Sequence, residues 1–424
     1  MLDRALLRNE TDRVRLAAEN KGEPCPIDEW LELDERRRRL LGETEELRRR
    51  RNELSNEVSS LKKDMDGDQA KLIYNLSRES KETGRRLAAI EKDLKAAETR
   101  MSDIELYFPN IPDPDVPVGN DESFNRIVKS AGEKPSFDFN PLPHWELLGE
   151  LLDSEASGSI TGSNFILLRG WAAWLQRILI SWMMDFNSNA GMEEVWVPFI
   201  ANRKSMTSTG QIPKLEYDMY HIEKDDLFLI PTGEVPLTNI YSDSILQDKD
   251  LPIRLFGYSP CFRREAGSYG KDTRGLNRVH QFEKVEMVRM VKPENSEVAL
   301  EEMTAHVGEM LELLNLPYRV SLLATGDLSF AASKCYDFEV WSAGQEKWLE
   351  VSSVSNFRGF QSRRGGIRYR PAAGGKLQYV HTLNGSGLAL PRLMAALIEN
   401  GQTESGRIVL PEILAERTGI EILG

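Results

Sequence analysis

Two runs of apolar residues at heptad spacing, within residues 27–108, constrain the fold more than any other feature of the sequence. In the first run, leucine recurs at every seventh position from Leu33 to Leu61. In the second, Ile73 to Phe108, apolar residues fit the a and d positions of a heptad, with Ser80 and Thr83 at two of them. The polar segment DGDQ between the runs predicts a reversal, and therefore an antiparallel helical coiled-coil arm. A helix of nearly forty residues is about 60 Å long, because each residue adds about 1.5 Å.

The first run carries two basic clusters, Arg36 to Arg39 and Arg48 to Arg51, separated by acidic residues. In one interpretation they are solvated flanks of the coiled coil, paired with glutamates on the same helix. In the other, they contact the phosphates of an elongated nucleic acid. The formal net charge of −13 argues against nucleic-acid binding through bulk charge, but it does not exclude a local basic surface.

Closely spaced prolines from Pro109 to Pro117 predict a domain boundary near residue 110. Beyond it, we expect helices around residues 168–187, 296–314 and 391–400. Strand-like runs such as MEEVWVPFI, KVEMVRMV and YDFEVW follow one another without strict βαβ alternation. This order favours an α+β domain on a mainly antiparallel sheet flanked by helices over a doubly wound fold.

Several classes of protein are disfavoured by what the sequence contains. The N-terminus is charged every few residues, which excludes a secretory signal and predicts a cytoplasmic protein. The most apolar segment, Phe165 to Phe186, is interrupted by charges, whereas a membrane-spanning helix needs about 20 predominantly apolar residues. We therefore expect a buried helix there and no membrane association. The three cysteines are far apart and the five histidines form no metal-binding pattern, so we expect neither a disulfide framework nor zinc.

The densest charge pattern lies in FRREAGSYGKDTRGLNRVHQFEKVE, residues 262–286. Its flanks, RLFGYSPCFRRE and NRVHQFEKVEMVRMV, are predicted to be strands of a hairpin. The connection between them, from about Gly267 to Asn277, is too long for a tight turn. Long loops of this kind tend to carry function.

Alternation along these strands sorts their side chains, because every second residue lies on the same face. Arg263 and Glu265 would point together from one strand, and His280, Phe282 and Glu286 from the other. Surface ion pairs could explain any single pair of charges, but they do not explain an aromatic ring among them. A guanidinium for phosphate, a ring for a base, and carboxylates for an amine or a metal ion together indicate a nucleotide site.

The same stretch resembles motif 2 of class II aminoacyl-tRNA synthetases, and specifically of the bacterial-type seryl-tRNA synthetase family. PTGEVPL resembles that family's serine-binding loop, EVSS its ATP and magnesium loop, and TLNGSGLALPRLMAALIEN its motif 3. WVPFI resembles the end of motif 1, where Pro198 would close a strand at a dimer interface. The motifs occur in the family's order, and the resemblance extends over essentially the whole chain, including the arm.

This resemblance implies a ligase that forms an aminoacyl-tRNA ester. It would activate L-serine with ATP to seryl-adenylate and transfer the seryl group to the 3′ end of tRNA(Ser), with tRNA(Sec) as an open second substrate. It further implies Mg²⁺, a cytoplasmic homodimer, a tRNA-binding domain over residues 1–110 and a catalytic domain over residues 111–424.

The resemblance also implies roles for individual residues. Arg263 and Arg392 are expected to be catalytic, with Arg263 on the α-phosphate and Arg392 stacked on the adenine opposite Phe282. The residues expected to bind serine are Thr232, Gly233, Glu234, Arg263, Glu286 and Ser386. Those expected to bind ATP are Arg263, Arg264, Glu265, Phe282, Glu350, Val351, Ser352, Ser353 and Arg392, of which Glu350 and Ser353 would also bind Mg²⁺. Those expected to contact tRNA are Arg36, Arg37, Arg38, Arg39, Arg48, Arg49, Arg50, Arg51, Lys271 and Arg274.

Some alternatives remain open. Glu234 and Glu286 could each pair with the ammonium group of serine, and the sequence does not divide the roles. Gly233 and Pro391 stand where the family often has alanine and glycine. A paralogue that loads an amino acid onto a carrier protein is an alternative function, which the intact arm disfavours. A non-enzymatic RNA-binding protein is another, which the complete set of site residues disfavours.

Overall fold

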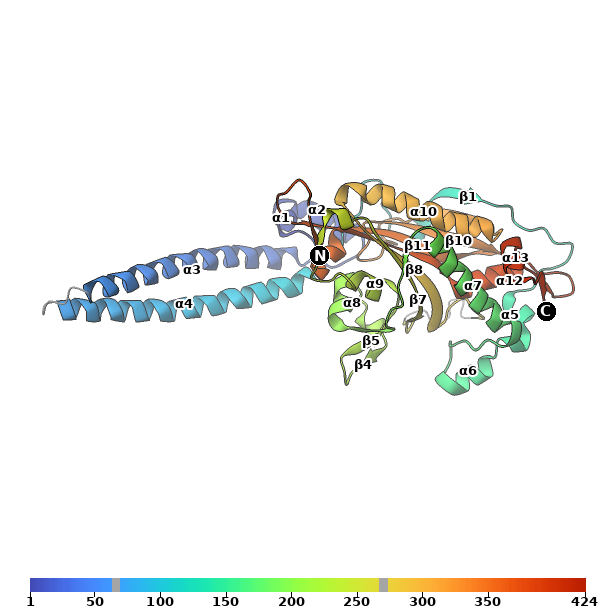
Figure 1. Cartoon of the computed structure of the whole chain (residues 1–424), viewed down its shortest axis with the longest axis horizontal. Helices are drawn as coiled ribbons and strands as arrows, with labels where there is room; N and C mark the ends of the chain where they lie inside the picture. Colours follow the sequence, from blue (N-terminus) through green and yellow to red (C-terminus); the bar gives the residue numbers. More distant parts are fainter. Residues whose placement is uncertain (63–68, 267–273) are drawn as a thin grey trace. The chain divides into compact units, whose positions relative to one another are not determined.

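The computed structural model describes residues 1–62, 69–266 and 274–424 (Figure 1). These residues divide into two compact units by their internal contacts. The smaller unit consists of Asp3–Leu16 and Pro24–Phe108. The larger unit consists of Met1–Leu2, Ala17–Glu23 and Pro109–Gly424.

The described residues form α-helices, β-strands and short 3₁₀ turns along the whole chain. The α-helices are α1 (Arg4–Asn9), α2 (Thr11–Asn20), α3 (Ile27–Leu61), α4 (Gln69–Glu105), α5 (His144–Leu148), α6 (Ser154–Thr161), α7 (Gly170–Asn189), α8 (Arg203–Thr209), α9 (Glu234–Asn239), α10 (Ser296–Leu313), α11 (Phe360–Gly365), α12 (Leu390–Asn400) and α13 (Glu412–Thr418). The strands are β1 (Arg126–Ala131), β2 (Glu193–Glu194), β3 (Ile200–Asn202), β4 (His221–Ile222), β5 (Leu227–Leu229), β6 (Ile245–Gln247), β7 (Ile253–Phe262), β8 (Gln281–Val291), β9 (Tyr318–Leu322), β10 (Lys334–Ser342), β11 (Lys347–Arg358), β12 (Arg368–Arg370), β13 (Gln378–Tyr379), β14 (His381–Ala389), β15 (Ile408–Val409) and β16 (Ile422–Leu423). Short 3₁₀ turns are η1 (Glu122–Phe124), η2 (Gly149–Leu151), η3 (Glu216–Asp218), η4 (Asp248–Asp250) and η5 (Pro293–Asn295).

The heptad runs form the two long helices of the smaller unit, α3 and α4, which lie side by side (Figure 1). The predicted seam residues Leu40, Leu54 and Leu87 are buried between them. Arg50 pairs with Glu79 at 2.8 Å, far along α3 and early in α4. Near the opposite ends, Glu29 pairs with Arg100, so the helices are antiparallel and the predicted coiled coil is confirmed. Most of the predicted reversal, residues 66–68, lies outside the described residues.

Two buried carboxylates fasten α1 to these two helices. Asp34, 1% exposed, accepts hydrogen bonds from Arg8 at 2.8 and 3.0 Å and also pairs with Arg37 and Arg38. Burial by itself would raise the pKa of Asp34, but the hydrogen bonds and positive charge of Arg8 hold it below its usual value. Glu105 is bound similarly, by Arg4 and by the indole N–H of Trp30.

The larger unit is built on a sheet with strand order β1-β9-β10-β11-β14-β8-β7-β2. Every neighbouring pair is antiparallel except β2 and β7, which are parallel. Helix α10 packs on β11 and β14, α12 on β10 and β11, and α7 on β7 and β8. Their buried faces form the main hydrophobic core. The predicted α+β class and mainly antiparallel sheet are confirmed.

Three predicted elements differ in extent from the observed ones. The run MEEVWVPFI forms only the two-residue strand β2 and the start of β3, so Pro198 does not close a continuous strand. The strand predicted through Glu265 ends at Phe262, and its partner begins at Gln281. The apolar segment that begins at Phe165 becomes helix α7 only from Gly170. Across the described residues, we find no helix with the length and apolar character needed to cross a membrane.

The cluster around Asp34 should stabilise the smaller unit through its negative charge. In Asp34→Asn, we expect the free energy of opening of the surrounding helices to fall by about 1–2 kcal/mol, because the arginines lose their ionised partner but remain partly exposed. Because the pKa of the folded Asp34 is lowered, this contribution exists above the unfolded pKa, about 3.9, and is lost as the pH falls through the folded value. Hydrogen exchange on the full chain at pH 7 and below pH 4 measures both effects. Asp93→Asn, which alters a carboxylate 60% exposed and 3.9 Å from Arg36, is the control; an equal effect of the two substitutions would contradict the assignment.

Candidate active site

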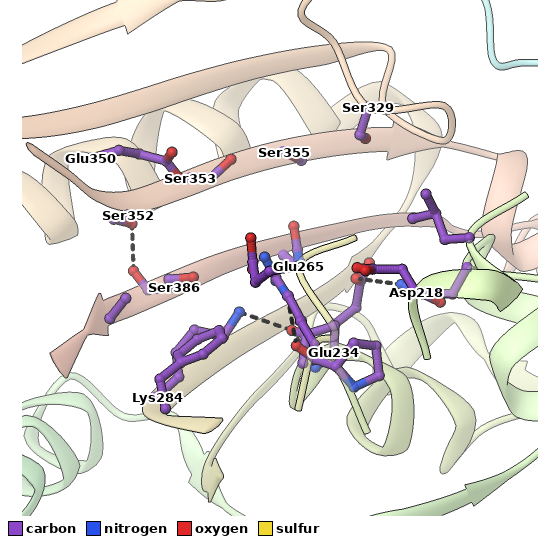
Figure 2. Close-up of a pocket in the computed structure, with 18 of the residues that line it drawn as sticks. Asp218, Glu234, Glu265, Lys284, Ser329, Glu350, Ser352, Ser353, Ser355 and Ser386 are labelled. Carbon is purple, nitrogen blue, oxygen red and sulfur yellow. Dashed lines mark hydrogen bonds between the residues drawn. The ribbon is translucent and has the colours of Figure 1, made fainter. Parts of the chain in front are cut away.

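A cavity of about 420 Å³ opens on the main sheet (Figure 2). Its walls come from the start of β8, much of β11 and β14, the first turn of α12, and the loops around residues 209–219, 276–279 and 329–331. The sequence-predicted residues that line it are Thr232, Glu234, Arg263, Glu265, Phe282, Glu350, Val351, Ser352, Ser353, Ser386 and Arg392. Gly233, Arg264 and Glu286 do not line it directly.

The pairing of β7 with β8 sorts the hairpin side chains as alternation predicts. Phe282 pairs with Cys261, and Glu286 with Gly257. Phe282 and Lys284, which share this parity, line the cavity, whereas Val285 and Met287 enter the main core. Arg263 lies just beyond β7, where its backbone N–H donates to the carbonyl of His280 at 2.9 Å, and its guanidinium lies 5.3 Å from the centre of the Phe282 ring. A cation and an aromatic ring therefore share this wall.

Glu286 is fully buried and fully compensated. Its carboxylate accepts hydrogen bonds from the hydroxyl of Thr232 and from Nδ2 of Asn384, each at 3.1 Å, and forms an ion pair with Lys284. The Lys284 ammonium also donates to the Thr232 hydroxyl at 2.9 Å (Figure 2). Gly233 packs against this group so closely that a Cβ there would lie 2.9 Å from Cβ of Glu286. The cluster therefore pairs one ammonium group with one carboxylate and leaves neither without a partner.

Glu234 is buried in a different way. It accepts hydrogen bonds from Nε2 of Gln361 at 2.6 Å and from Nε2 of Gln211 at 3.4 Å. Among the described residues it has no ion-pair partner. Burial raises the pKa of Glu234 to about 7, aided by the nearby negative charge of Glu286 and opposed by the Gln361 hydrogen bond. A cationic ligand group arriving at this carboxylate would find an unsatisfied negative charge.

The opposite wall combines β11, β14 and α12. Ser352 donates a hydrogen bond to the backbone carbonyl of Ser386 at 2.6 Å (Figure 2). Glu350 is half exposed at the cavity and lies 3.4 Å from a guanidinium nitrogen of Arg392, which also donates to the Glu350 backbone carbonyl. Ser353 lies on the same strand, with its hydroxyl 3.0 Å from the thiol of Cys335. Carboxylate and hydroxyl oxygens therefore line this wall beside a guanidinium.

Two predicted ATP contacts have other partners in the structure. Glu265 lines the cavity with φ of 52°, and Arg278 donates to its carboxylate at 3.0 Å. Arg264 turns away from the cavity, donating to the carbonyl of Met219 while its guanidinium stacks on Tyr220. The β7 strand ends before these residues, so strand alternation does not extend to them.

The arginines predicted to contact tRNA are mostly paired within the arm. Arg36, Arg48 and Arg50 form ion pairs with residues of α4, Arg37 and Arg38 with Asp34, and Arg39 with Glu43. In the described chain, Arg49 and Arg51 form no ion pair and are exposed. Arg274 lies 5.0 Å from the ring centre of Trp145. Lys271 falls outside the described residues.

Sequence reasoning missed several residues of the site. Lys284 shares the parity of Phe282 and Glu286, so strand alternation could have identified it. Asn384 is two residues from Ser386 on β14 and could have been found in the same way. Gln211 and Gln361 come from distant segments, and no local pattern marks them.

Lys21 was also missed, although it supports the cavity wall. Its ammonium donates to the backbone carbonyls of Ser329 at 2.9 Å and Ala332 at 2.6 Å, and it lies 3.4 Å from that of Phe330. Burial lowers the pKa of Lys21 to about 7. Ser329 and Phe330 line the cavity, so a residue near the N-terminus fixes the loop on which they lie.

Known proteins resemble this chain in both sequence and structure. Residues 1–112 match the family model "Seryl-tRNA synthetase N-terminal domain", and residues 217–401 match "tRNA synthetase class II core domain (G, H, P, S and T)". The serine–tRNA ligases of Thermomicrobium roseum and Salinibacter ruber are 48% and 47% identical to this chain, over 99% and 100% of it and 94% and 99% of their own lengths. A crystal structure of seryl-tRNA synthetase from Pyrococcus horikoshii complexed with ATP has a TM-score of 0.94 at 34% identity, covering 100% of this chain and 99% of that one.

These relatives match both the arm and the unit that carries the cavity, and their identity is well above the level at which only a fold is shared. The chain belongs to the seryl-tRNA synthetase family.

Proposed function

We propose that this protein is a serine–tRNA ligase. Serine would attack the α-phosphorus of ATP through its carboxylate, forming seryl-adenylate and releasing pyrophosphate. A ribose hydroxyl at the 3′ end of tRNA(Ser) would then take the seryl group and release AMP. The observation that carries this proposal is the pair of unlike carboxylates, Glu234 and Glu286, in a chain whose relatives are serine–tRNA ligases. The comparisons give no support to the carrier-protein alternative.

The unlike carboxylates suggest a division of roles. Glu234, without a cationic partner in the described chain, would accept the ammonium group of serine. Glu286, already neutralised by Lys284, would accept the serine hydroxyl together with Ser386, its partner in the β8–β14 pairing. If alanine bound in place of serine, these buried oxygens would lack a hydrogen-bond donor. The enzyme could therefore reject alanine strongly without a separate step that hydrolyses mischarged products.

ATP would bind between the Arg263–Phe282 wall and the β11–α12 wall. Arg263 would follow the charge that builds on the α-phosphate, and Arg392 would stack on the adenine opposite Phe282. Glu265 would accept at the adenine edge after release from Arg278, while Arg264, Val351 and Ser352 complete the predicted ATP set. These roles rest on the family motif and on the placement of Arg263, Phe282 and Arg392 around one cavity.

Mg²⁺ fits the chemistry of the β11 wall. Glu350 offers a half-exposed carboxylate and Ser353 a hydroxyl on the same strand, and such hard oxygen ligands suit a magnesium ion that keeps phosphate and water ligands as well. When bound there, the ion would neutralise phosphate charge. In the described residues, no group of three or more histidine, cysteine, aspartate or glutamate side chains is arranged to hold a metal by itself.

The smaller unit would serve the tRNA, within a tRNA-binding domain of residues 1–110 and beside a catalytic domain of residues 111–424. Arg49 and Arg51, which have no ion-pair partner among the described residues, are its first candidates for phosphate contacts, whereas the paired arginines also stabilise the coiled coil. Arg274 would contact the acceptor end. Charging of tRNA(Sec) and a cytoplasmic location remain predictions from the sequence.

A homodimer would explain exposed apolar side chains near Pro198. Trp196 is 74% exposed and Ile200 43% exposed, both in the segment that resembles motif 1. Isolated exposed apolar residues are common, but a neighbouring pair in a motif associated with dimerisation suggests an interface.

For the proposed function, the first prediction concerns Glu286. We expect Glu286→Gln to lower kcat/KM for serine in serine-dependent ATP–pyrophosphate exchange by at least about 100-fold, because one accepting oxygen becomes a donating NH₂ group and Lys284 loses its ion-pair partner. Glu312→Gln, which alters a carboxylate that pairs with Lys129 at 3.1 Å and does not line the cavity, is the control and should retain activity. Near-normal exchange in Glu286→Gln would refute the role, and exchange driven by another amino acid would refute the function.

The second prediction follows from the raised pKa of Glu234. Only the ionised carboxylate can hold an ammonium group, so kcat/KM for serine should fall about tenfold per pH unit below about 7 and level off above it. The profile for ATP, measured with saturating serine, should lack this inflection. In Glu234→Gln, the serine profile should be low and free of the inflection; an unchanged inflection would assign the titration to another group.

The third prediction concerns the arm. We expect Arg49→Glu with Arg51→Glu to lower kcat/KM for tRNA charging by about 10–100-fold and to make its salt dependence shallower, while pyrophosphate exchange without tRNA is unchanged. Arg49→Lys with Arg51→Lys keeps the charge and should retain most charging. Equal loss of exchange and charging would contradict the separation of the two activities.

A further inference from the structure

A buried polar cluster lies behind the cavity wall. His144 at the start of α5 and Glu399 in α12 are both fully buried, and neither lines the cavity. Nδ1 of His144 lies 2.7 Å from a carboxylate oxygen of Glu399. The Glu399 carboxylate also accepts from the backbone N–H groups of His144, at 2.9 Å, and Gly344, at 3.0 Å. Because the ring is sealed from the cavity, it cannot exchange protons with a bound substrate, and its role must be indirect.

One chain of hydrogen bonds leads from this pair to the cavity wall. The backbone N–H of Leu276 donates to Nε2 of His144 at 2.8 Å. The ring is therefore neutral with its proton on Nδ1, which donates to Glu399. Gly275 has φ of 68°, and a Cβ there would lie 2.2 Å from Nε2. The backbone at these two residues is held directly against the imidazole ring.

A second chain of hydrogen bonds leads from Glu399 to Asn277, the residue after Leu276. Nε2 of Gln345 donates to Glu399 at 2.8 Å, and because a carboxylate only accepts, this bond fixes the orientation of the Gln345 amide. Its oxygen then accepts from Nδ2 of Asn277 at 2.7 Å. The carbonyl of Asn277 accepts from Nε of Arg392 at 3.0 Å. Arg392 and Glu399 lie seven residues, about two turns, apart on α12, so the chain closes on the helix from which it began.

We propose that His144 and Glu399 are positioning residues that fix Leu276, Asn277 and Arg392 in the ATP-binding wall of the cavity. All three of the positioned residues line the cavity. The inference deepens the proposed function and rests on it, since it assigns this wall to ATP. Without the imidazole, the Leu276 N–H loses its acceptor and the Glu399 carboxylate loses one of its donors. The backbone at Leu276 and Asn277 is then held less firmly, and with it the Asn277 carbonyl that accepts from Arg392.

The test compares the Michaelis constants of the two small substrates in pyrophosphate exchange. In His144→Phe, we expect KM for ATP to rise about tenfold while KM for serine changes by less than about twofold. Gln345→Met breaks only the second chain at a partly exposed residue and should raise KM for ATP about threefold. His144→Gln supplies a donor and an acceptor again and should restore most of the ATP affinity.

His306→Phe is the matched control. That ring is partly buried and is hydrogen-bonded to Asn187 at 2.9 Å, but it does not line the cavity, so neither KM should change. A merely structural role for His144 would lower the melting temperature and kcat while leaving both KM values alone. That result, or an unchanged KM for ATP in both His144→Phe and Gln345→Met, would overturn the proposal.

Failure of the proposed function would be recognised separately, as absence of serine-dependent exchange in the unaltered protein. Calorimetric titration with ATP then tests the inference alone: the dissociation constant should rise about tenfold in His144→Phe and remain unchanged in His306→Phe. Equal ATP affinity in the unaltered protein and His144→Phe would reject the positioning role.

Discussion

Backbone hydrogen bonds between β7 and β8 bring Arg263 and Phe282 to the cavity wall and hold Glu286 behind it, against the cavity-lining Thr232 and Asn384, and the candidate active site depends on this alignment. The antiparallel register pairs Glu286 with Gly257 and Phe282 with Cys261, so a shift by one residue would turn the ring and the carboxylate into the hydrophobic core. The neighbouring strand β14 pairs Ser386 with Glu286 and so adds a hydroxyl to the proposed serine pocket. A cation, an aromatic ring and a group of buried polar side chains, the three kinds of group that a seryl-adenylate would need, thereby come together around one cavity.

Charge compensation distinguishes parts of the pocket that would otherwise look alike. A buried carboxylate is costly unless it is paired. Lys284 supplies the positive charge that pairs with Glu286. Glu234, in contrast, accepts side-chain hydrogen bonds only from amides among the described residues, and its pKa is raised. A substrate that brings its own ammonium group supplies the missing charge. Amino-acid binding would therefore relieve an electrostatic strain that the folded chain carries alone.

The sequence predicted those features that depend on local periodicity. Heptad spacing identified the coiled coil, and strand alternation placed Phe282 and Glu286 on one face. The sequence patterns did not predict local conformations that depend on tertiary contacts. Glu265 has φ of 52° and lies outside the strand, and most of MEEVWVPFI does not form a strand. Partners such as Gln361, 127 residues from Glu234, have no local signature. The roles of the site residues came from the family resemblance, since single pairs of charges are common on protein surfaces.

The position of Lys21 in the sequence determines how the chain can be divided into fragments. Although the chain divides into two compact units, residues 17–23 belong to the unit that carries the cavity, and the Lys21 ammonium binds the loop at Ser329 and Ala332. A single cut near Pro109 would thus remove a buried cation from the loop that lines the cavity and leave three backbone carbonyls without this donor. In chain order, residues 24–108 of the smaller unit stand between two segments of the unit that carries the cavity, so excising them requires two cuts and a bridging linker.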